Sequence, residues 1–373
     1  MTSDASALDI FLELAALPSP PGRERVVADR VHAFLHDLGL ETDEDAAGEA
    51  IGSDIGNIYC RLPATGRGTP IFLNAHLDTV PPTDEIEPVE EDGIITNRRP
   101  TILGADNKAA VAVMLAAVRD LVSDGAAHAG VELVFTPMEE VGLRGAKRFD
   151  VSRLDAQFGY CYDHAAPIGD IVLAAPSQRS LRLVFKGRPA HSGIAPEDGR
   201  SAILAASRAI AAMPLGRIDD RTTANVGLIE GGIAGNIVPP ECVVHAEARS
   251  RDEGRLAETV QSMLDACTAA AQETGCTVEA AVNSEYLTYR FRPDALPVAL
   301  AVRALGREGY TARFIESGGG SDANAFNASG IPCVNLCNGM AEIHTSDEHI
   351  TVADLEGMTR VTRALVDLAR DDA

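Results

Sequence analysis

The alternation of strand-like and helix-like segments constrains the fold of this chain more than any other feature. Apolar residues recur at helical spacing in segments such as 25–40 and 106–125, and short apolar runs such as 70–76 and 131–136 are typical of buried strands. Strands that alternate with helices favour an α/β fold. We therefore predict a mostly parallel sheet flanked by helices.

This alternation is interrupted once, by a segment that carries a complete pattern of its own. Between residues 178 and 286 the predicted order is the βαββαβ arrangement of ferredoxin-like domains, and strand–helix alternation resumes after it. One or two domains are expected for 373 residues. We expect an α/β domain of residues 1–177 and 287–373 and an inserted domain of residues 178–286.

Composition excludes several classes of function. The formal net charge of −23 at pH 7 opposes binding to nucleic acid and to anionic membranes. No apolar run reaches the length that spans a bilayer, and the first residues show no signal-peptide pattern. The seven cysteines are scattered, as is typical of buried thiols in a reducing compartment. We predict a cytoplasmic protein without nucleic-acid or membrane partners, with solvated loops at the acidic runs 41–50 and 82–93.

One predicted strand ends by presenting a histidine and a carboxylate. Successive side chains of a strand point to opposite faces, so His76 and Asp78 lie on the same side. An imidazole that binds a metal usually donates its other N–H to a carboxylate. The pair therefore fits a metal ligand and the residue that orients it. Solvated polar residues before a proline turn are the alternative interpretation.

Four further places bring acids or a histidine to strand ends or nearby turns. In open α/β sheets, ligands gather beyond the carboxyl ends of the strands. Imidazole and carboxylate ligands without thiolate suit Zn²⁺, Mn²⁺ or Co²⁺. Two histidines with several acids predict two ions, about 3.5–4 Å apart and bridged by one carboxylate. The residues at these four places are Asp106, the pair Glu139 and Glu140, Asp163, and His344.

The adjacent acids Glu139 and Glu140 suit two different tasks, because neighbouring side chains diverge. One of them would bind metal. The other would take a proton from a metal-bound water and pass it to the leaving amine. This set of residues predicts a metal-dependent hydrolase that cuts a peptide or a related amide.

Several motifs together resemble the di-zinc M20 metallopeptidases, and among these the peptidase T-like branch. The motifs are "HLDTV", "GADNKAAVA", "TPMEEVGLRGAK", "AHSGIAPEDG" and "SGGGSDANAF…GIP…HTSDEHI", which run from about Ile55 to Ile350. The resemblance implies a catalytic domain of the zinc exopeptidase type with an inserted lid domain. It also implies two divalent ions per chain, zinc in the first place, with cobalt or manganese as alternatives.

The resemblance also implies a role for each acid and histidine of the site. Glu139 would be the general base, and Asp78 would orient His76. The peptide bond between Asp106 and Asn107 would be cis, and Asn107 departs from the second aspartate that many relatives carry there. The ligands would be His76 and Asp163 for one ion, Glu140 and His344 for the other, and Asp106 as the bridge.

In the inserted domain the resemblance implies three further functional residues. His191 would stabilise the oxyanion, and Asn236 and Arg249 would contact substrate. The lid domain would form a homodimer in which each subunit lends His191 to the other. The implied activity is aminopeptidase action on short peptides, with tripeptides as the first candidate. Carboxypeptidase, dipeptidase and N-acyl-amino-acid deacylase activities remain alternatives within the same group.

Two classes outside this group are disfavoured by the sequence. A non-catalytic descendant would have lost the base, yet Glu139 accompanies all five ligand positions. A two-metal phosphatase or nuclease would need basic residues near the motifs, and no such cluster is visible there. Among the remaining polar residues, His32 and His36 have zinc-like spacing but no third ligand nearby. We assign them to a solvated helix face, and Glu348 and His349 to the surroundings of the site or the surface.

Overall fold

The computed structural model describes residues 5–82 and 85–371, and it divides into two compact units. Unit 1 comprises Met1–Leu173, Arg290–Ser317 and Ser321–Ala373, whereas unit 2 comprises Ala174–Tyr289 and Gly318–Gly320. The chain therefore passes between the units a few residues away from the boundaries expected from the sequence. The short segment 318–320, which groups with unit 2, was not part of that expectation.

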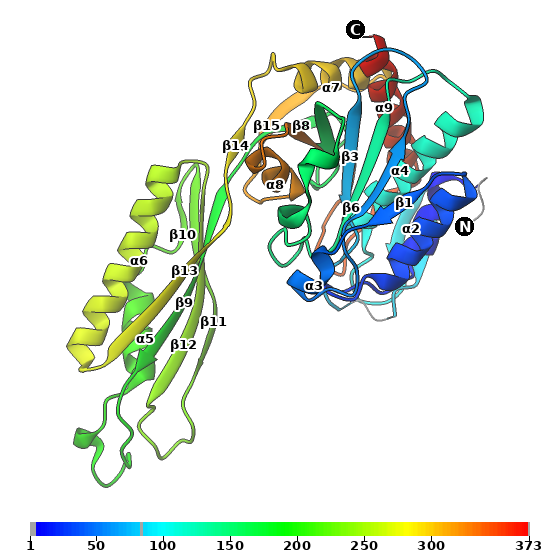
Figure 1. Ribbon diagram of the computed structural model, residues 1–373. Coiled ribbons are helices and arrows are strands. Elements are labelled where there is room, and N and C mark those ends of the chain that lie inside the picture. Colours follow the sequence, from blue (N-terminus) through cyan, green and yellow to red (C-terminus); the bar gives the residue numbers. More distant parts are fainter. Residues whose placement is uncertain (1–4, 83–84, 372–373) are drawn as a thin grey trace. The chain divides into compact units, whose positions relative to one another are not determined.

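Unit 1 is built on a nine-stranded sheet (Figure 1). Its strand order is β1-β2-β6-β3-β7-β16-β8-β14, and β15 pairs with β8. The four central strands β6, β3, β7 and β16 are parallel, whereas β1 and β2 on one side and β8 on the other are antiparallel to their neighbours. The predicted α/β fold with a mainly parallel sheet is thus confirmed. The strands are β1 (Thr42–Glu44), β2 (Ile58–Leu62), β3 (Ile71–His76), β6 (Val131–Thr136), β7 (Phe158–Cys161), β8 (Asp170–Ala175), β14 (Tyr289–Arg290), β15 (Arg313–Glu316) and β16 (Cys333–Leu336).

Helices cover this sheet and complete its core. Helix α4 packs against β3 and also contacts α1 and α9, and α9 contacts α7; α8 packs against β16, β3 and β7. Every residue of β3 and β6 is buried, as is typical of the mainly apolar central strands of a parallel sheet. The helices are α1 (Ala7–Ala15), α2 (Arg25–Asp37), α3 (Ala47–Ile51), α4 (Ala105–Asp124), α7 (Leu296–Arg307), α8 (Asp322–Ala328) and α9 (Val352–Asp371), with two 3₁₀ turns at Ala146–Arg148 and Val151–Arg153.

Both acidic runs that the sequence analysis assigned to loops contain regular structure, so that prediction was wrong. The first includes β1 and most of α3. The second includes β4 (Pro88–Glu91), which pairs with β5 (Ile94–Asn97), and β5 pairs with β17 (Ile350–Thr351) in a small sheet. Acidic residues occupy exposed positions of these short elements. The sequence there therefore shows charge rather than the alternation of apolar and polar residues that indicates a strand.

Unit 2 is a five-stranded antiparallel sheet with two helices packed against it (Figure 1). Its strand order is β10-β11-β12-β9-β13, and the apolar sides of α5 and α6 form a separate core with it. Along the chain the elements follow the predicted βαββαβ order with one additional short strand, β10. The elements are β9 (Ser177–Lys186), α5 (Ala202–Ala212), β10 (Gly216–Asp219), β11 (Thr222–Gly231), β12 (Glu241–Ser250), α6 (Glu253–Thr274) and β13 (Thr277–Tyr286), with a 3₁₀ turn at Pro196–Asp198.

Two further observations concern the cysteines and the apolar character of the helices. All seven cysteines are buried and none forms a disulfide. Within the described part of the chain, no helix combines the length and the apolar character needed to cross a membrane.

Candidate metal centre

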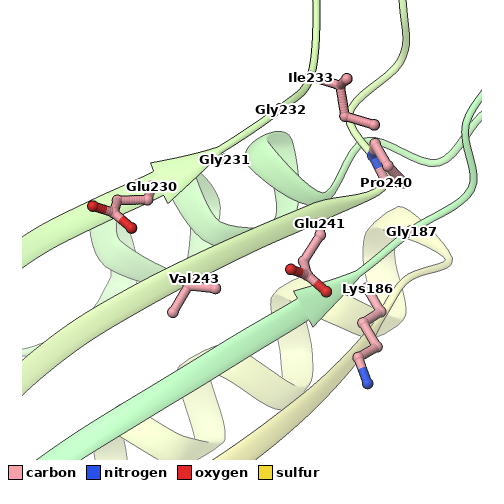
Figure 2. Close-up of a pocket in the computed structure, with 9 residues that line it drawn as sticks. All are labelled: Lys186, Gly187, Glu230, Gly231, Gly232, Ile233, Pro240, Glu241 and Val243. Carbon is pink, nitrogen blue, oxygen red and sulfur yellow. The ribbon is translucent and has the colours of Figure 1, made fainter.

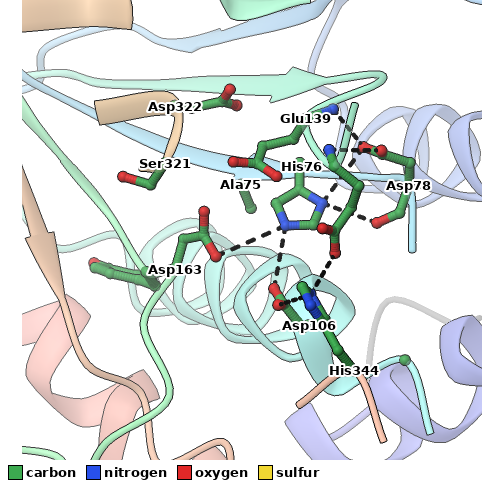
Figure 3. Close-up of polar contacts among 12 residues, drawn as sticks. Ala75, His76, Asp78, Asp106, Glu139, Asp163, Ser321, Asp322 and His344 are labelled. Atoms are coloured by element: carbon green, nitrogen blue, oxygen red, sulfur yellow. Dashed lines mark hydrogen bonds and ion pairs between the residues drawn. The ribbon is translucent and has the colours of Figure 1, made fainter. Parts of the chain in front are cut away.

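A histidine and several acids lie at the carboxyl ends of three neighbouring parallel strands in the unit 1 sheet (Figure 3). His76 is the last residue of β3, Glu139 and Glu140 follow β6, and Asp163 follows β7. Because β6, β3 and β7 are adjacent and parallel, their carboxyl ends meet at the same edge. The sequence prediction that these residues converge agrees with this geometry.

Asp106 lies between two histidines and turns one carboxylate oxygen toward each. Its Oδ1 is 3.2 Å from Nε2 of His76, and its Oδ2 is 3.3 Å from Nε2 of His344. The peptide bond between Asp106 and Asn107 is cis, as the resemblance implied, and the backbone angles of both residues are non-helical. The side chain of Asp106 lies ahead of the regular part of α4, with one oxygen facing each of the two imidazoles.

The remaining acids surround the same two imidazoles. Glu140 Oε1 is 3.1 Å from Nε2 of His344, and Asp163 Oδ1 is 3.8 Å from Nε2 of His76. The ligand atoms of His76, Asp106 and Glu140 all lie within 4.8 Å of one another, as do those of His76, Glu139 and Asp163. Two ligands about 2.0–2.2 Å from one tetrahedral zinc are roughly 3.3 Å apart. The spacing in this cluster fits divalent ions held between the side chains.

The charges of the cluster also fit bound cations. Burial raises the pKa of Glu139 well above its usual range, and the nearby Asp163 carboxylate adds to this effect. Burial likewise raises the pKa of Glu140 to about 7 and that of Asp163 to about 6, with the Asp106 carboxylate contributing to both. Hydrogen bonds to Asp106 and Glu140 raise the pKa of His344 to about 10. Such a concentration of buried carboxylates calls for positive charge, which divalent ions would supply in place of protons.

Asp78 contacts His76 differently from the expectation. His76 Nδ1 lies 2.8 Å from the backbone oxygen of Asp78, whereas the Asp78 carboxylate is 3.5 Å away. The carboxylate instead accepts the backbone N–H groups of Glu139 at 2.9 Å and Glu140 at 3.1 Å. Asp78 therefore holds the imidazole with its carbonyl group and the base-bearing loop with its side chain.

The sequence analysis did not assign three buried acids beside the site as a ligand, as the base or as an orienting residue. Glu24 accepts the backbone N–H of Met138 at 3.1 Å, and Asp322 accepts the hydroxyl of Thr136. Asp322 belongs to the "SGGGSDANAF" motif of the family resemblance, which was a usable signal. Glu348 accepts three backbone N–H groups of the segment before α4, including that of Asp106. Glu348 belongs to the "HTSDEHI" part of the same motif, but nothing there indicates its backbone partners, and Glu24 stands in none of the quoted motifs.

The three predicted residues of unit 2 fall into two separate places. His191 forms an isolated β-bridge with Ile237, and Ser192 N–H donates to the carbonyl of Asn236, so His191 and Asn236 come from adjacent segments. Both are exposed. Arg249 lies near the end of β12, opposite Gln178 of β9, and its guanidinium pairs with Glu247 at 3.0 Å. The structure brings His191 and Asn236 together and places Arg249 at the other end of the sheet.

A hollow of about 590 Å³ lies in unit 2 at the ends of β9, β11 and β12 (Figure 2). Its lining includes Lys186, Glu230 and Glu241, but no histidine, cysteine or serine. Lys186 Nζ is paired with Glu279 at 2.6 Å. This hollow therefore offers no histidine or cysteine ligand for a metal and no serine or cysteine nucleophile.

Comparison with known proteins identifies the family. Residues 72–368 match the model of peptidase family M20/M25/M40. The chain is 37% identical over 369 residues to the uncharacterized protein YqjE of Bacillus subtilis, covering 99% of this chain and 100% of that protein. The chain belongs to peptidase family M20/M25/M40, and it is a hydrolase and a metallopeptidase, as the sequence motifs predicted.

Two solved structures are similar over nearly the whole chain. The aminopeptidase PepT from Bacillus cereus is 40% identical, with a TM-score of 0.86 and coverage of 97% of this chain and 98% of that chain. A tripeptidase (SAV1512) from Staphylococcus aureus is 35% identical, with a TM-score of 0.92 and coverage of 98% of both chains. The fold is thus shared with an aminopeptidase and a tripeptidase over nearly the whole chain.

Proposed function

We propose that this protein is an aminopeptidase that hydrolyses short peptides, tripeptides above all, with two divalent ions bound in unit 1. The observation that carries the proposal is Asp106, whose two carboxylate oxygens face His76 and His344 at 3.2 and 3.3 Å. Similarity to proteins described as an aminopeptidase and a tripeptidase supports the substrate class. Zinc suits the nitrogen and oxygen ligands, and cobalt or manganese would suit them as well.

We assign Glu140 and His344 to one ion, His76 and Asp163 to the other, and Asp106 to both. When bound, such a pair of ions lowers the pKa of a water and polarises the scissile carbonyl. Glu139 is buried beside the ligands and pairs with neither histidine in the described contacts, so its carboxylate is the group that accepts the proton from the water. The same carboxyl group then donates that proton to the departing amine. The Asp78 carboxylate accepts the backbone N–H of Glu139 and so fixes the backbone from which the Glu139 side chain extends.

The separation of the unit 2 residues supports a homodimer. β12 runs from Glu241 to Ser250, with Asn236 before its start and Arg249 near its end. Strands rise about 3.4 Å per residue, so the eight steps from residue 241 to residue 249 span about 27 Å. A tripeptide, at about 3.3–3.6 Å per residue, cannot contact both ends of this strand. If both ends serve catalysis, His191 and Asn236 of one subunit act with Arg249 of the other.

The edge of β11 is a suitable place for two subunits to pair. β10 pairs with β11 only at Thr222–Ala224, and along the rest of β11 the described residues provide no partner on that side. Leu228 and Ile229 on this stretch are 59% and 49% exposed. An exposed edge with apolar side chains readily pairs with another strand. We place the protein in the cytoplasm, where its free thiols would stay reduced.

A substrate panel tests this proposal against the other activities of the family. The metal-loaded enzyme should cut a free tripeptide and its C-terminal amide, and it should fail to cut the N-acetylated tripeptide. Preference for dipeptides, a requirement for the free C-terminal carboxylate, or release of an N-acyl group would instead assign the protein to dipeptidases, carboxypeptidases or deacylases, respectively.

A further inference from the structure

Glu348 satisfies three backbone donors with one buried carboxylate. Its Oε2 accepts the N–H groups of Leu103 at 2.7 Å and Gly104 at 2.8 Å, and its Oε1 accepts the N–H of Asp106 at 2.9 Å. The side chain is only 2% exposed. Burial raises the pKa of Glu348, and these three hydrogen bonds counteract that rise. An exposed carboxylate would be satisfied by water, whereas this buried carboxylate is satisfied by three backbone N–H groups.

The segment that donates these bonds cannot satisfy its own N–H groups. Gly104 has a φ of 77°, and Asp106 is non-helical with φ −83° and ψ 102°, so regular helical bonding starts only further along α4. Leu103, Gly104 and Asp106 are all buried. A buried N–H without a partner costs about as much as a lost hydrogen bond. Glu348 therefore determines whether this irregular conformation is stable.

One short segment thus holds Asp106 at both its backbone and its side chain. His344 Nε2 is 3.3 Å from Asp106 Oδ2, and Glu348, four residues further on, binds the Asp106 N–H. We propose that Glu348 is a positioning residue that fixes the bridging carboxylate of Asp106 between the two ions. This inference rests on the proposed function, because it assumes that Asp106 binds metal.

The substitution Glu348→Gln separates positioning from general stability. Both carboxylate oxygens accept backbone N–H groups, but a glutamine has one oxygen and a donor NH₂ in place of the other. At least one backbone donor would then face another donor, and the segment that carries Asp106 would shift or loosen. Changes in groups that orient metal ligands typically reduce metal affinity about 10–100-fold.

Glu132 provides a matched control at the other end of the strands. It is 1% exposed, and its carboxylate accepts the N–H groups of Asp155 at 3.2 Å and Ala156 at 2.7 Å together with the hydroxyl of Tyr59. Glu132 lies at the start of β6, whereas the metal cluster follows the end of that strand. Glu132→Gln should therefore lower the melting temperature without changing metal affinity.

The experiment titrates metal-depleted protein with Zn²⁺ in competition with a chromophoric chelator, and it records the melting temperature of the same samples. Glu348→Gln should weaken the affinity for Zn²⁺ about 10–100-fold. Glu132→Gln should bind as tightly as the unaltered protein. Equal affinity of Glu348→Gln and the unaltered protein would overturn the proposal, even with a lowered melting temperature. Failure of the unaltered protein to bind Zn²⁺, Co²⁺ or Mn²⁺ would instead overturn the proposed function.

A second measurement needs no variant and remains decisive if Glu348→Gln does not fold. Hydrogen exchange of the unaltered, metal-free protein should show protected amides at Leu103, Gly104 and Asp106, because each is bonded to Glu348. Exchange of all three at the rate of free amides would show that the Glu348 carboxylate does not hold the segment, and it would overturn the proposal.

Discussion

Oε1 of Glu140 lies 3.1 Å from Nε2 of His344, although the two residues are 204 positions apart in the chain. Glu140 follows β6, and His344 lies shortly before β17. The backbone φ of His344 is 64°, a value that residues other than glycine seldom adopt. Unusual backbone conformations of this kind cluster at functional sites. Glu140 and His344, the two residues that we propose as ligands of one ion, thus meet beside Asp106.

The first prediction separates the two adjacent glutamates. Glu139→Gln keeps the size of the side chain and removes the proton acceptor, so kcat should fall about 10²–10⁴-fold while the metal content stays unchanged. Glu140→Gln removes a charged ligand and should lower the metal content. Steady-state kinetics and metal analysis of both variants provide the check. The reverse pattern would mean that the roles of Glu139 and Glu140 are exchanged.

The second prediction concerns the pH dependence of stability through Glu24. Burial raises the pKa of this acid from 4.5 to about 7 in the folded protein. Between these two values the folded state retains a proton that the unfolded state releases, so the contribution of Glu24 to stability is lost as the pH rises. Glu24→Gln has no such titration and should gain stability relative to the unaltered protein as the pH rises from 4.5 to about 7.

The geometry around Glu24 explains why glutamine fits there. Oε1 accepts the N–H groups of Gly22 and Met138, and Oε2 contacts the hydroxyl of Ser53. A glutamine oxygen can accept both N–H groups while its amide donates to Ser53, as a protonated carboxyl would. Melting temperatures measured across this pH range test the idea. A difference between the two proteins that does not vary with pH would contradict it, and Glu24→Ala should be less stable at every pH.

The third prediction concerns the shared active site. His191→Ala should reduce kcat about 10²–10³-fold, the usual effect of removing one oxyanion donor. Mixing His191→Ala with Glu139→Gln under subunit exchange should restore part of the activity, because a mixed dimer would contain one intact site. Mixed dimers that form but stay inactive would show that His191 acts within its own chain or not in catalysis.

Most of the proposed ligands could be picked out from the sequence because they follow an apolar strand or stand at the start of a helix, whereas His344 lies in a loop. His76, Asp163 and the pair Glu139 and Glu140 all stand at such boundaries, and parallel strands bring these ends together. Glu348 lies in the "HTSDEHI" motif, but that motif does not indicate which groups Glu348 contacts. Its partners are backbone N–H groups more than 240 positions away, and any sequence can provide those groups. The role of such a residue becomes visible only once the chain is folded.

Dependence on partners that are distant in the sequence also explains which strands were not predicted. β4, β5 and β17 are short, and β17 joins the other two from the far end of the chain. β10 is a four-residue strand with two exposed positions that pairs only with the start of β11. Short strands with little burial have no clear period, so their pairing depends on neighbours that are distant in sequence.

The central claim is that two divalent ions per chain, bridged by Asp106, are required for peptide hydrolysis. The most direct measurement is the metal content of the protein, determined together with tripeptide hydrolysis, as Zn²⁺ is added back to the chelated enzyme. We predict that activity is absent without metal and reaches its maximum at two ions per chain, and that Asp106→Asn binds fewer ions and stays inactive. Full activity with one ion or none would contradict the two-metal account.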